Sequence, residues 1–141
     1  MAEKIVVIDG KEVGFRATAL TPRLYRHKIG RDMVRDLNLL KRSYEKALSA
    51  MNMEKPGKDA TADEVARYEQ ELQDAQLSEI DLEIFENAAF IMARQYGGQN
   101  VPNTPEEWLD EFTFFSIYEV LPHILELWQV NQHTTSIPKK K

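Results

Sequence analysis

Residues 78–98 read SEIDLEIFENAAFIMARQYGG and set the architecture of this chain. Apolar side chains recur there at helical spacing over more than half of the circumference of a helix, and a helix of that kind lies inside a core. The helical pattern restarts at Ser78, and Gly97-Gly98 supplies residues that commonly end a helix. The apolar positions are Ile80, Ile84, Phe85, Ala88, Ala89, Phe90, Ile91, Met92 and Tyr96. We therefore expect the other elements to pack around this helix.

A second helical pattern lies upstream, from Thr21 to about Met51. Thr21-Pro22 predicts a helix start, because a hydroxyl can cap the first turn and a proline tolerates the first position. Gly30 predicts a pause in this helix. Beyond it, apolar residues recur at alternating spacings of three and four: Met33, Leu37, Leu40, Tyr44, Ala47 and Met51. The seam covers fewer than three heptads, so it favours packing within one chain over a coiled-coil dimer.

The first eighteen residues predict a β-hairpin over residues 3–18. Residues Ile5–Ile8 are β-branched, and Asp9-Gly10 follows them at the place of a two-residue turn. A lone hairpin is marginally stable in water, so its apolar face is expected to rest on a helix.

The segment between the two helical patterns is polar. Residues 52–60 contain Pro56-Gly57 and predict a mobile loop. Thr61 and Glu64 then form a capping-box pattern, which predicts an amphipathic helix to about Leu77. Its apolar line consists of Val65, Tyr68 and Leu72.

The last third of the chain predicts a broken helix followed by a tail. Thr104–Glu107 combines a cap, a proline at the first position and a glutamate that can reach back to the cap. Ser116 with Glu119 is a second capping pattern and indicates a break, while Pro122 predicts a kink. Residues 132–141 are expected to form a flexible, lysine-rich tail.

Together these patterns predict a mainly α protein, a bundle of four to five helices with an N-terminal β-hairpin. The length of 141 residues suits one domain, which we place at residues 1–131. No run of residues is long and apolar enough to cross a membrane, and no signal peptide is evident. We expect an intracellular protein without membrane contact.

The residue types argue against an enzyme. The chain has no cysteine, which excludes disulfides and thiolate chemistry. No catalytic serine arrangement or nucleotide-binding motif occurs. Glu119, His123 and Glu126 can share a helix face at metal-binding spacing, but no second helix supplies a Glu-x-x-His element. We therefore predict no catalytic residue, no metal site and no cofactor.

Charge is separated along the chain. Between Arg23 and Lys46 there are eight basic and three acidic residues, whereas residues 59–126 contain sixteen acidic and two basic ones. Such a separation steers association. The pattern favours pairing within the chain or with a second copy, as a homo-oligomer. Nucleic acid is a less favoured partner, because the basic segment lacks the glycine and aromatic pattern of single-strand platforms.

Six aromatic residues near the C-terminus are candidates for core or for a partner surface: Trp108, Phe112, Phe114, Phe115, Tyr118 and Trp128. Trp108 and Phe112 are predicted to be core. For Phe114, Tyr118 and Trp128 both interpretations stay open, because exposed aromatic residues mark binding surfaces. The residues that we predict for partner contact are Phe114, Tyr118, Leu125 and Trp128, with Arg23, Arg26 and Arg35 as their electrostatic complement.

The order of several blocks resembles one protein family. The blocks are YRHKIGRD (25–32), FENAAFIMA (85–93), EEWLDEF (106–112), SIYEVLPHILELW (116–128) and the final lysines. This order is similar to that of tail assembly chaperones from long, non-contractile-tailed phages and prophages of Gram-positive bacteria. The resemblance covers most of residues 15–141 and is weakest over 52–78.

The resemblance implies a protein that acts by binding in the host cytoplasm. Such chaperones hold the tape-measure protein, help the tail-tube protein to polymerise around it and are absent from the finished virion. They are often made in two lengths by ribosomal frameshifting, and the codons of Lys139–Lys141 could form the slippery stretch. Two alternatives stay open: a nucleic-acid-binding regulator that uses the basic helix, and a permanent structural tail or connector protein.

Overall fold

The computed structural model describes the backbone of residues 2–135 and the side chains of residues 2–130. It is mainly helical with an N-terminal antiparallel hairpin, which confirms the predicted fold class. The elements in chain order are β1 (Ala2–Ile8), β2 (Lys11–Ala17), α1 (Thr21–Ile29), α2 (Met33–Met51), α3 (Ala62–Asp74), α4 (Glu79–Gly97), the 3-10 turn η1 (Gly98–Asn100), α5 (Pro105–Leu109) and α6 (Ile117–Thr135).

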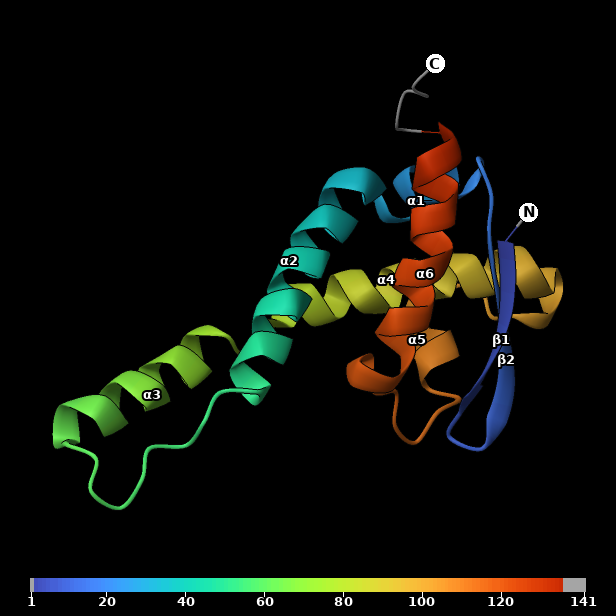
Figure 1. Ribbon diagram of the computed structural model, residues 1–141. Coiled ribbons are helices and arrows are strands. Elements are labelled where there is room, and N and C mark those ends of the chain that lie inside the picture. The colour runs from blue at the N-terminus through green and yellow to red at the C-terminus, as the bar shows by residue number, and fades with distance from the viewer. Residues whose placement is uncertain (1, 136–141) are drawn as a thin grey trace.

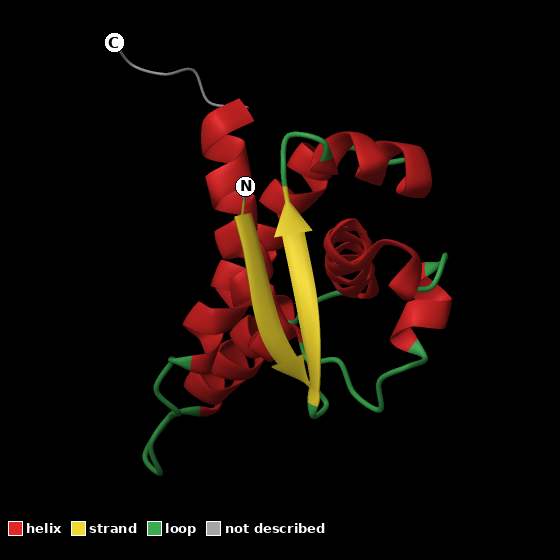
Figure 2. Ribbon diagram, turned by 90° about the vertical axis from the view of Figure 1, so that its right-hand side faces the viewer, coloured by secondary structure: helices red, strands yellow, loops and turns green. Residues whose placement is uncertain are grey.

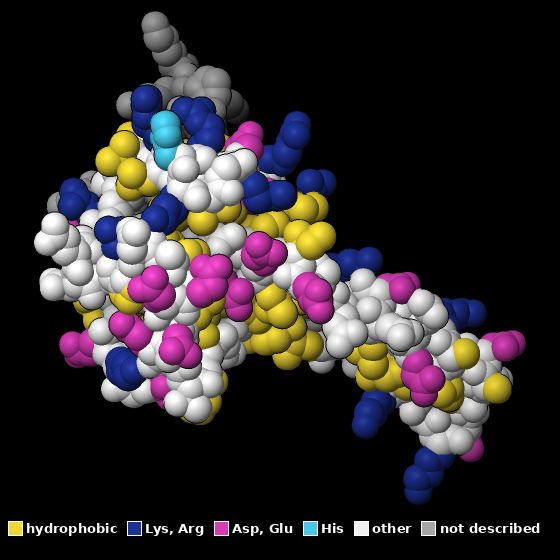
Figure 3. Space-filling view, turned by 180° about the vertical axis from the view of Figure 1, so that it is seen from behind, with side chains coloured by type: hydrophobic (Ala, Val, Ile, Leu, Met, Phe, Trp, Pro, Cys, Tyr) yellow, Lys and Arg dark blue, Asp and Glu magenta, His cyan; other side chains and the backbone are white. Residues whose placement is uncertain are grey.

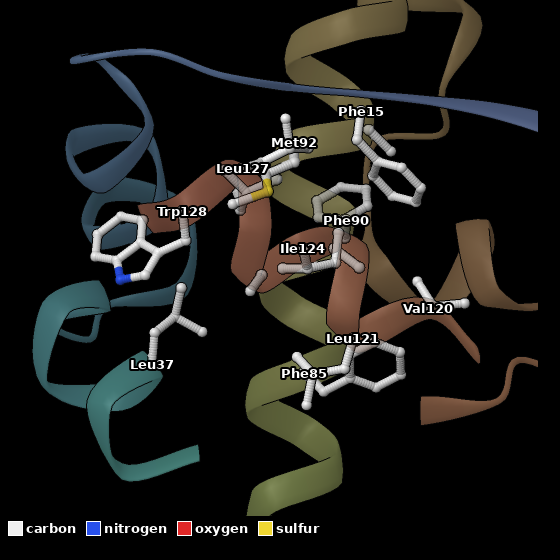
Figure 4. Packing of buried hydrophobic residues seen from close by; sticks show 14 of the residues in the cluster. Phe15, Leu37, Phe85, Phe90, Met92, Val120, Leu121, Ile124, Leu127 and Trp128 are labelled. Carbon is white, nitrogen blue, oxygen red and sulfur yellow. The ribbon is translucent and has the colours of Figure 1, made fainter. Parts of the chain in front are cut away.

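Helix α4 lies at the centre, as its sequence predicts. It contacts β2, α1, α2, α5 and α6, and these elements surround it in Figure 1. Nine of its side chains are buried, including the run Ala88–Ala93. Figure 4 shows how α6 packs against it: Leu121, Ile124 and Leu127 lie next to Phe85, Phe90 and Met92. Burial of such side chains contributes about 1.5–3 kcal/mol each, so α4 organises the core.

The hairpin packs between α4 and α6 through its inner face (Figure 2). Val6, Ile8, Phe15 and Ala17 are buried, while the outer residues Ile5 and Val7 are exposed. Asp9 and Gly10 both have positive φ, as the predicted two-residue turn requires. Lys4 forms an ion pair of 2.7 Å with Glu126 of α6, which joins the two ends of the chain.

The helix starts predicted at Thr21, Thr61 and Thr104 are confirmed to within one residue, and the structure adds a capping box at Ser78 that the sequence analysis did not predict. The Ser78 hydroxyl accepts from the backbone N–H of Asp81, and the Asp81 carboxylate accepts in return from the N–H of Ser78. Thr104 and Thr61 accept from the N–H of Glu107 and of Glu64 at the starts of α5 and α3, but neither glutamate side chain bonds back to the cap, so only half of each predicted capping box is present. The predicted cap at Thr21 is wrong, because Thr21 is the first residue of α1 and its hydroxyl caps no backbone N–H of that helix. Its buried hydroxyl donates to Gln95 of α4 instead, because that contact satisfies it inside the core.

The predicted pause at Gly30 separates α1 from α2. Gly30 has φ 81°, a left-handed conformation that ends α1, and Asp32 then caps α2. The two helices are joined by a buried carboxylate. Asp36 accepts from the Tyr25 hydroxyl at 2.8 Å and from Arg31 at 2.8 and 2.9 Å. This cluster fixes the angle at which α1 leaves α2.

Aromatic side chains connect the hairpin to the C-terminal third. Trp108 is buried, and its ring contacts those of Phe15, Phe90, Phe112 and Phe115. The core prediction for Trp108 is confirmed, and Phe112 packs partly buried against it. Helix α5 ends at Leu109, so residues 110–116 form a loop that holds these rings. The predicted break before α6 is confirmed.

Helix α3 projects from the body as an arm (Figure 1). None of its residues is buried, and residues 52–61 connect it to α2. At the other end, α6 runs through Pro122 and continues to Thr135, so the predicted tail boundary after Asn131 is too early. The helix extends because each further residue adds a backbone hydrogen bond and no glycine or proline intervenes. Lys139–Lys141 lie outside the described residues.

Candidate binding surface

Two exposed aromatic side chains mark the most conspicuous surface of the body. Phe114 is 66% exposed and Tyr118 is 43% exposed, although both are large apolar groups. Each lies next to an aromatic contact with the body. Phe115, next to Phe114, stacks on Phe85 with ring centres 5.1 Å apart, and Tyr118 packs on Tyr44 of α2 at 5.9 Å. The Tyr118 ring is therefore packed against α2, and the backbone that carries Phe114 is fixed by its neighbour Phe115.

The hairpin turn fixes the loop that carries Phe114. The carboxylate of Asp9 accepts from the backbone N–H of Thr113 at 2.8 Å. Lys11 donates to the carbonyl oxygen of Glu111, and its ammonium lies 5.4 Å from the centre of the Phe112 ring. A charged acceptor strengthens a hydrogen bond, so residues 111–113 are tied to the hairpin on both sides of Phe112.

Further exposed apolar side chains lie on α2 and α4, the helices that carry Tyr44 and Phe85. Leu48 and Met51 follow Tyr44 along one face of α2, and Leu82 precedes Phe85 by three positions on α4. We define the apolar surface as Leu48, Met51, Leu82, Phe114 and Tyr118. Seen from behind, hydrophobic side chains gather on the underside of the body beside the base of the arm (Figure 3).

Acidic side chains border the apolar surface. Figure 3 shows a row of them above the hydrophobic patch. Glu83 and Glu86 lie on α4, next to Leu82 and Phe85 in sequence. Burial, together with the charge of Glu83, raises the pKa of Glu86 above its ordinary value. A basic group on a partner would stabilise the charged form of such a carboxylate. The acidic border therefore favours ligands with lysine or arginine.

Two of the predicted contact residues do not belong to this surface. Trp128 is only 2% exposed and lies beside Leu37 in the core (Figure 4), so its prediction as a partner residue is wrong. The reason is geometric: Trp128 follows Leu121 and Ile124 on the face of α6 that α2 and α4 cover. Leu125 is half-buried against the core. Phe114 and Tyr118 are exposed, as a partner surface requires.

The three predicted arginines lie on a different part of the molecule. Arg23 and Arg26 on α1 and Arg35 on α2 are exposed, but α1 and the start of α2 lie at the end of the body opposite the arm. The three arginines therefore do not lie beside Phe114 as the predicted electrostatic complement of the aromatic contact residues. Arg31 pairs with Asp36 of the same segment. Among residues 2–130 no ion pair joins the other bases of the segment to an acid: Arg23, Arg26, Lys28, Arg35, Lys41, Arg42 and Lys46. Pairing within the chain therefore leaves this basic surface unneutralised.

Sequence reasoning missed Leu48, Met51 and Leu82 as surface residues. Met51 belongs to the predicted apolar seam of α2. The seam continues beyond the part of α2 that other helices cover, so its last residue is exposed. The available signal was the position of these residues near helix ends, where a crossing helix no longer covers the apolar face.

The described residues contain no cluster of three or more potential metal ligands. No described helix is long and apolar enough to cross a membrane. The chain matches no protein-family model, no curated protein and no solved structure.

Proposed function

We propose that this protein is a tail assembly chaperone of a long-tailed phage or prophage, and that the apolar surface binds amphipathic helical segments of the tape-measure protein. The observation that carries the proposal is the exposure of Phe114 and Tyr118 on a rigid base. In helix-in-groove recognition, apolar side chains spaced by three or four positions on the bound helix pack against exposed apolar side chains of the receptor. The order of sequence blocks described above supports the same family.

The chemistry of the surface suits a ligand of variable sequence. Phe, Tyr, Met and Leu side chains make apolar contacts that do not depend on one hydrogen-bonding pattern, and methionine repacks readily. The acidic border adds attraction for a helix with basic flanks. A long helical partner with many such segments would gather several copies, and linkage along one chain raises the overall affinity.

The decisive experiment is co-expression with the large protein encoded directly downstream, followed by pull-down. Phe114→Ala and Tyr118→Ala are expected to reduce recovery of the partner at least tenfold. Val7→Ala is the matched control, because Val7 is equally exposed but lies on the outer face of the hairpin. Equal recovery with all three variants, or no recovery with the wild type, contradicts the proposal.

The unpaired basic surface favours a second candidate, a nucleic-acid-binding regulator. Such a protein is expected to retain DNA in a strongly salt-dependent manner, and Arg26→Glu is expected to weaken that retention. Absence of DNA binding at low salt excludes this candidate. Mass spectrometry of purified virions tests the third one, since a structural tail protein is present there and a chaperone is absent.

A further inference from the structure

A pocket opens between α1 and the C-terminal end of α4, away from the apolar surface defined above. It has a volume of about 470 Å³, and its walls are mostly apolar, with Leu24 of α1 and Ile91 of α4 among them. Ligand pockets occupy about 300–1,000 Å³ and combine apolar walls with a few polar groups. No residue of the apolar surface lines this pocket, so it is a second and separate candidate site.

Hydrogen bonds between side chains hold the walls of the pocket together. The Nε2 atom of Gln95 on α4 donates to the Thr18 hydroxyl at 2.6 Å, and its Oε1 atom accepts from the Thr21 hydroxyl at 2.6 Å. Gln95 itself lines the pocket, and Thr21 is the first residue of α1. The pocket is therefore formed before a ligand arrives, which reduces the entropy that binding costs.

The rim of the pocket is cationic. Lys28 of α1 and Arg94 of α4 both line it, His27 lies beside Lys28 in the lining, and none of the lining residues is acidic. Among the side chains of residues 2–130, neither Lys28 nor Arg94 forms an ion pair. The positive charge beside the apolar walls is therefore not neutralised by this part of the chain, and charge complementarity favours an anionic ligand.

Arg94 has the free donors that a carboxylate requires. Its Nη1 atom donates to the carbonyl oxygens of Val101 and Pro102 at 2.7 and 3.0 Å, which fixes the guanidinium. Its Nε and Nη2 atoms donate to no group of the described residues and are not buried. These two N–H groups lie on one edge of the guanidinium and can donate to both oxygens of a carboxylate. Lys28, which donates to Asn103 of the same segment at 3.3 Å, adds a second positive charge.

A carboxylate joined to an apolar group would satisfy both parts of this site. The last residue of a polypeptide provides this combination at a single position, because its main chain ends in a carboxylate and its side chain can be apolar. A bound helix would instead need a long groove that accepts several anchors. The pocket is a single hollow between two helices, so it suits a chain end better.

We infer that this pocket binds the C-terminus of another polypeptide that ends in a large apolar residue. The terminal carboxylate lies against Nε and Nη2 of Arg94, and the apolar side chain lies between Leu24 and Ile91. Capture of a chain end through its carboxylate is one of the recurring modes of peptide recognition. The inference does not rest on the proposed binding of tape-measure helices, which uses a different face of the molecule.

Fluorescence anisotropy of the full chain with labelled peptides tests the inference. The probe is an octapeptide of glycine and serine that ends in phenylalanine and leucine, with a fluorophore at its N-terminus and a free C-terminal carboxylate. The same peptide with a C-terminal amide is expected to bind about tenfold or more weakly, because it lacks the negative charge that Arg94 would bind. A probe that ends in two lysines is expected not to bind.

Gln99→Glu is the sharpest variant, because it adds a carboxylate to the lining of the pocket with almost no change in the size of the side chain. It is expected to weaken binding of the free-acid probe about fivefold or more, and Lys28→Glu is expected to act in the same direction. Gln73→Glu on the exposed arm α3 is the matched control and should bind like the wild type. Circular dichroism of each variant checks that it is folded.

Nuclear magnetic resonance locates the bound peptide. The amide signals of Gly98 and Gln99, which both line the pocket, are expected to shift with the free-acid probe, and those around Phe114 are expected not to shift. Equal affinity of the free-acid and amidated probes overturns the inference, and so does unchanged binding to Gln99→Glu or the absence of binding by every peptide. Binding of dodecanoate without binding of the free-acid peptide also overturns it, because the ligand would then be a free fatty acid and not a chain end.

Discussion

The Asp9 carboxylate accepts a hydrogen bond from the backbone N–H of Thr113, so the turn of the hairpin positions the neighbour of Phe114. These two residues are 104 positions apart in sequence. The contact makes the presentation of an exposed aromatic ring depend on an element at the opposite end of the chain.

Replacement of Asp9 therefore affects both stability and binding. Asp9→Gly keeps the positive φ of the turn but removes the acceptor, and we expect the free energy of unfolding to fall by about 1–2 kcal/mol. Asp9→Asn, which retains an oxygen acceptor and tolerates the same backbone, serves as the control. Urea unfolding measures the change, and pull-down of the proposed partner should weaken for the glycine variant alone. Identical unfolding midpoints for both variants would show that the bond to Thr113 contributes nothing.

The Asp36 cluster predicts loss of stability in acid. Burial raises the pKa of Asp36, but the hydrogen bonds from Arg31 and Tyr25 outweigh it and hold that pKa below its ordinary value of 3.8. The unfolded carboxyl binds its proton first, so the contribution is complete above about pH 4 and is lost as the pH falls through the folded pKa. Asp36→Asn is expected to cost about 1–3 kcal/mol at neutral pH. The difference between wild type and variant, measured by urea unfolding, should shrink in acid; a constant difference contradicts this account.

Gly14 is required by close packing. A Cβ at position 14 would collide with the ring of Tyr96, which covers the strand at that point. Gly14→Ala is expected to displace the ring and to destabilise the protein by about 1–3 kcal/mol. In the Tyr96→Ala background the same substitution should be almost neutral. A double-mutant cycle by thermal or chemical unfolding measures the coupling, and additive effects would rule out the collision.

Trp128 is expected to behave as a core residue. Trp128→Ala removes a large buried side chain and should destabilise by about 3–5 kcal/mol. Trp128→Phe should cost much less, because it also removes the Nε1–H, which has no hydrogen-bond partner within the described residues. Both tryptophans are buried, so the native emission is expected at shorter wavelength than that of the unfolded chain. A native emission maximum like that of the unfolded protein would contradict the placement of both indoles.

Local signals in the sequence predicted most of the fold. Helix caps such as Thr61 and Thr104, the Asp9-Gly10 turn and the break at Gly30 depend on neighbouring residues, so they can be recognised without knowledge of the tertiary structure. The cap predicted at Thr21 was wrong because the Thr21 hydroxyl donates instead to Gln95, a residue 74 positions away in the sequence. The candidate site was harder to predict. Whether Trp128 or Met51 is covered depends on where two helices cross, and the periodicity of one helix does not contain that information.

The ion pair between Lys4 and Glu126 spans almost the whole sequence, and this has a consequence for synthesis. β1 emerges from the ribosome first, yet the helix that it packs against is completed last. Contacts between such distant residues form slowly, because a long loop must close before they are gained. The body can therefore close only after α6 has been translated, and until then the inner face of the hairpin stays exposed to solvent and to any folding factor that binds apolar surface.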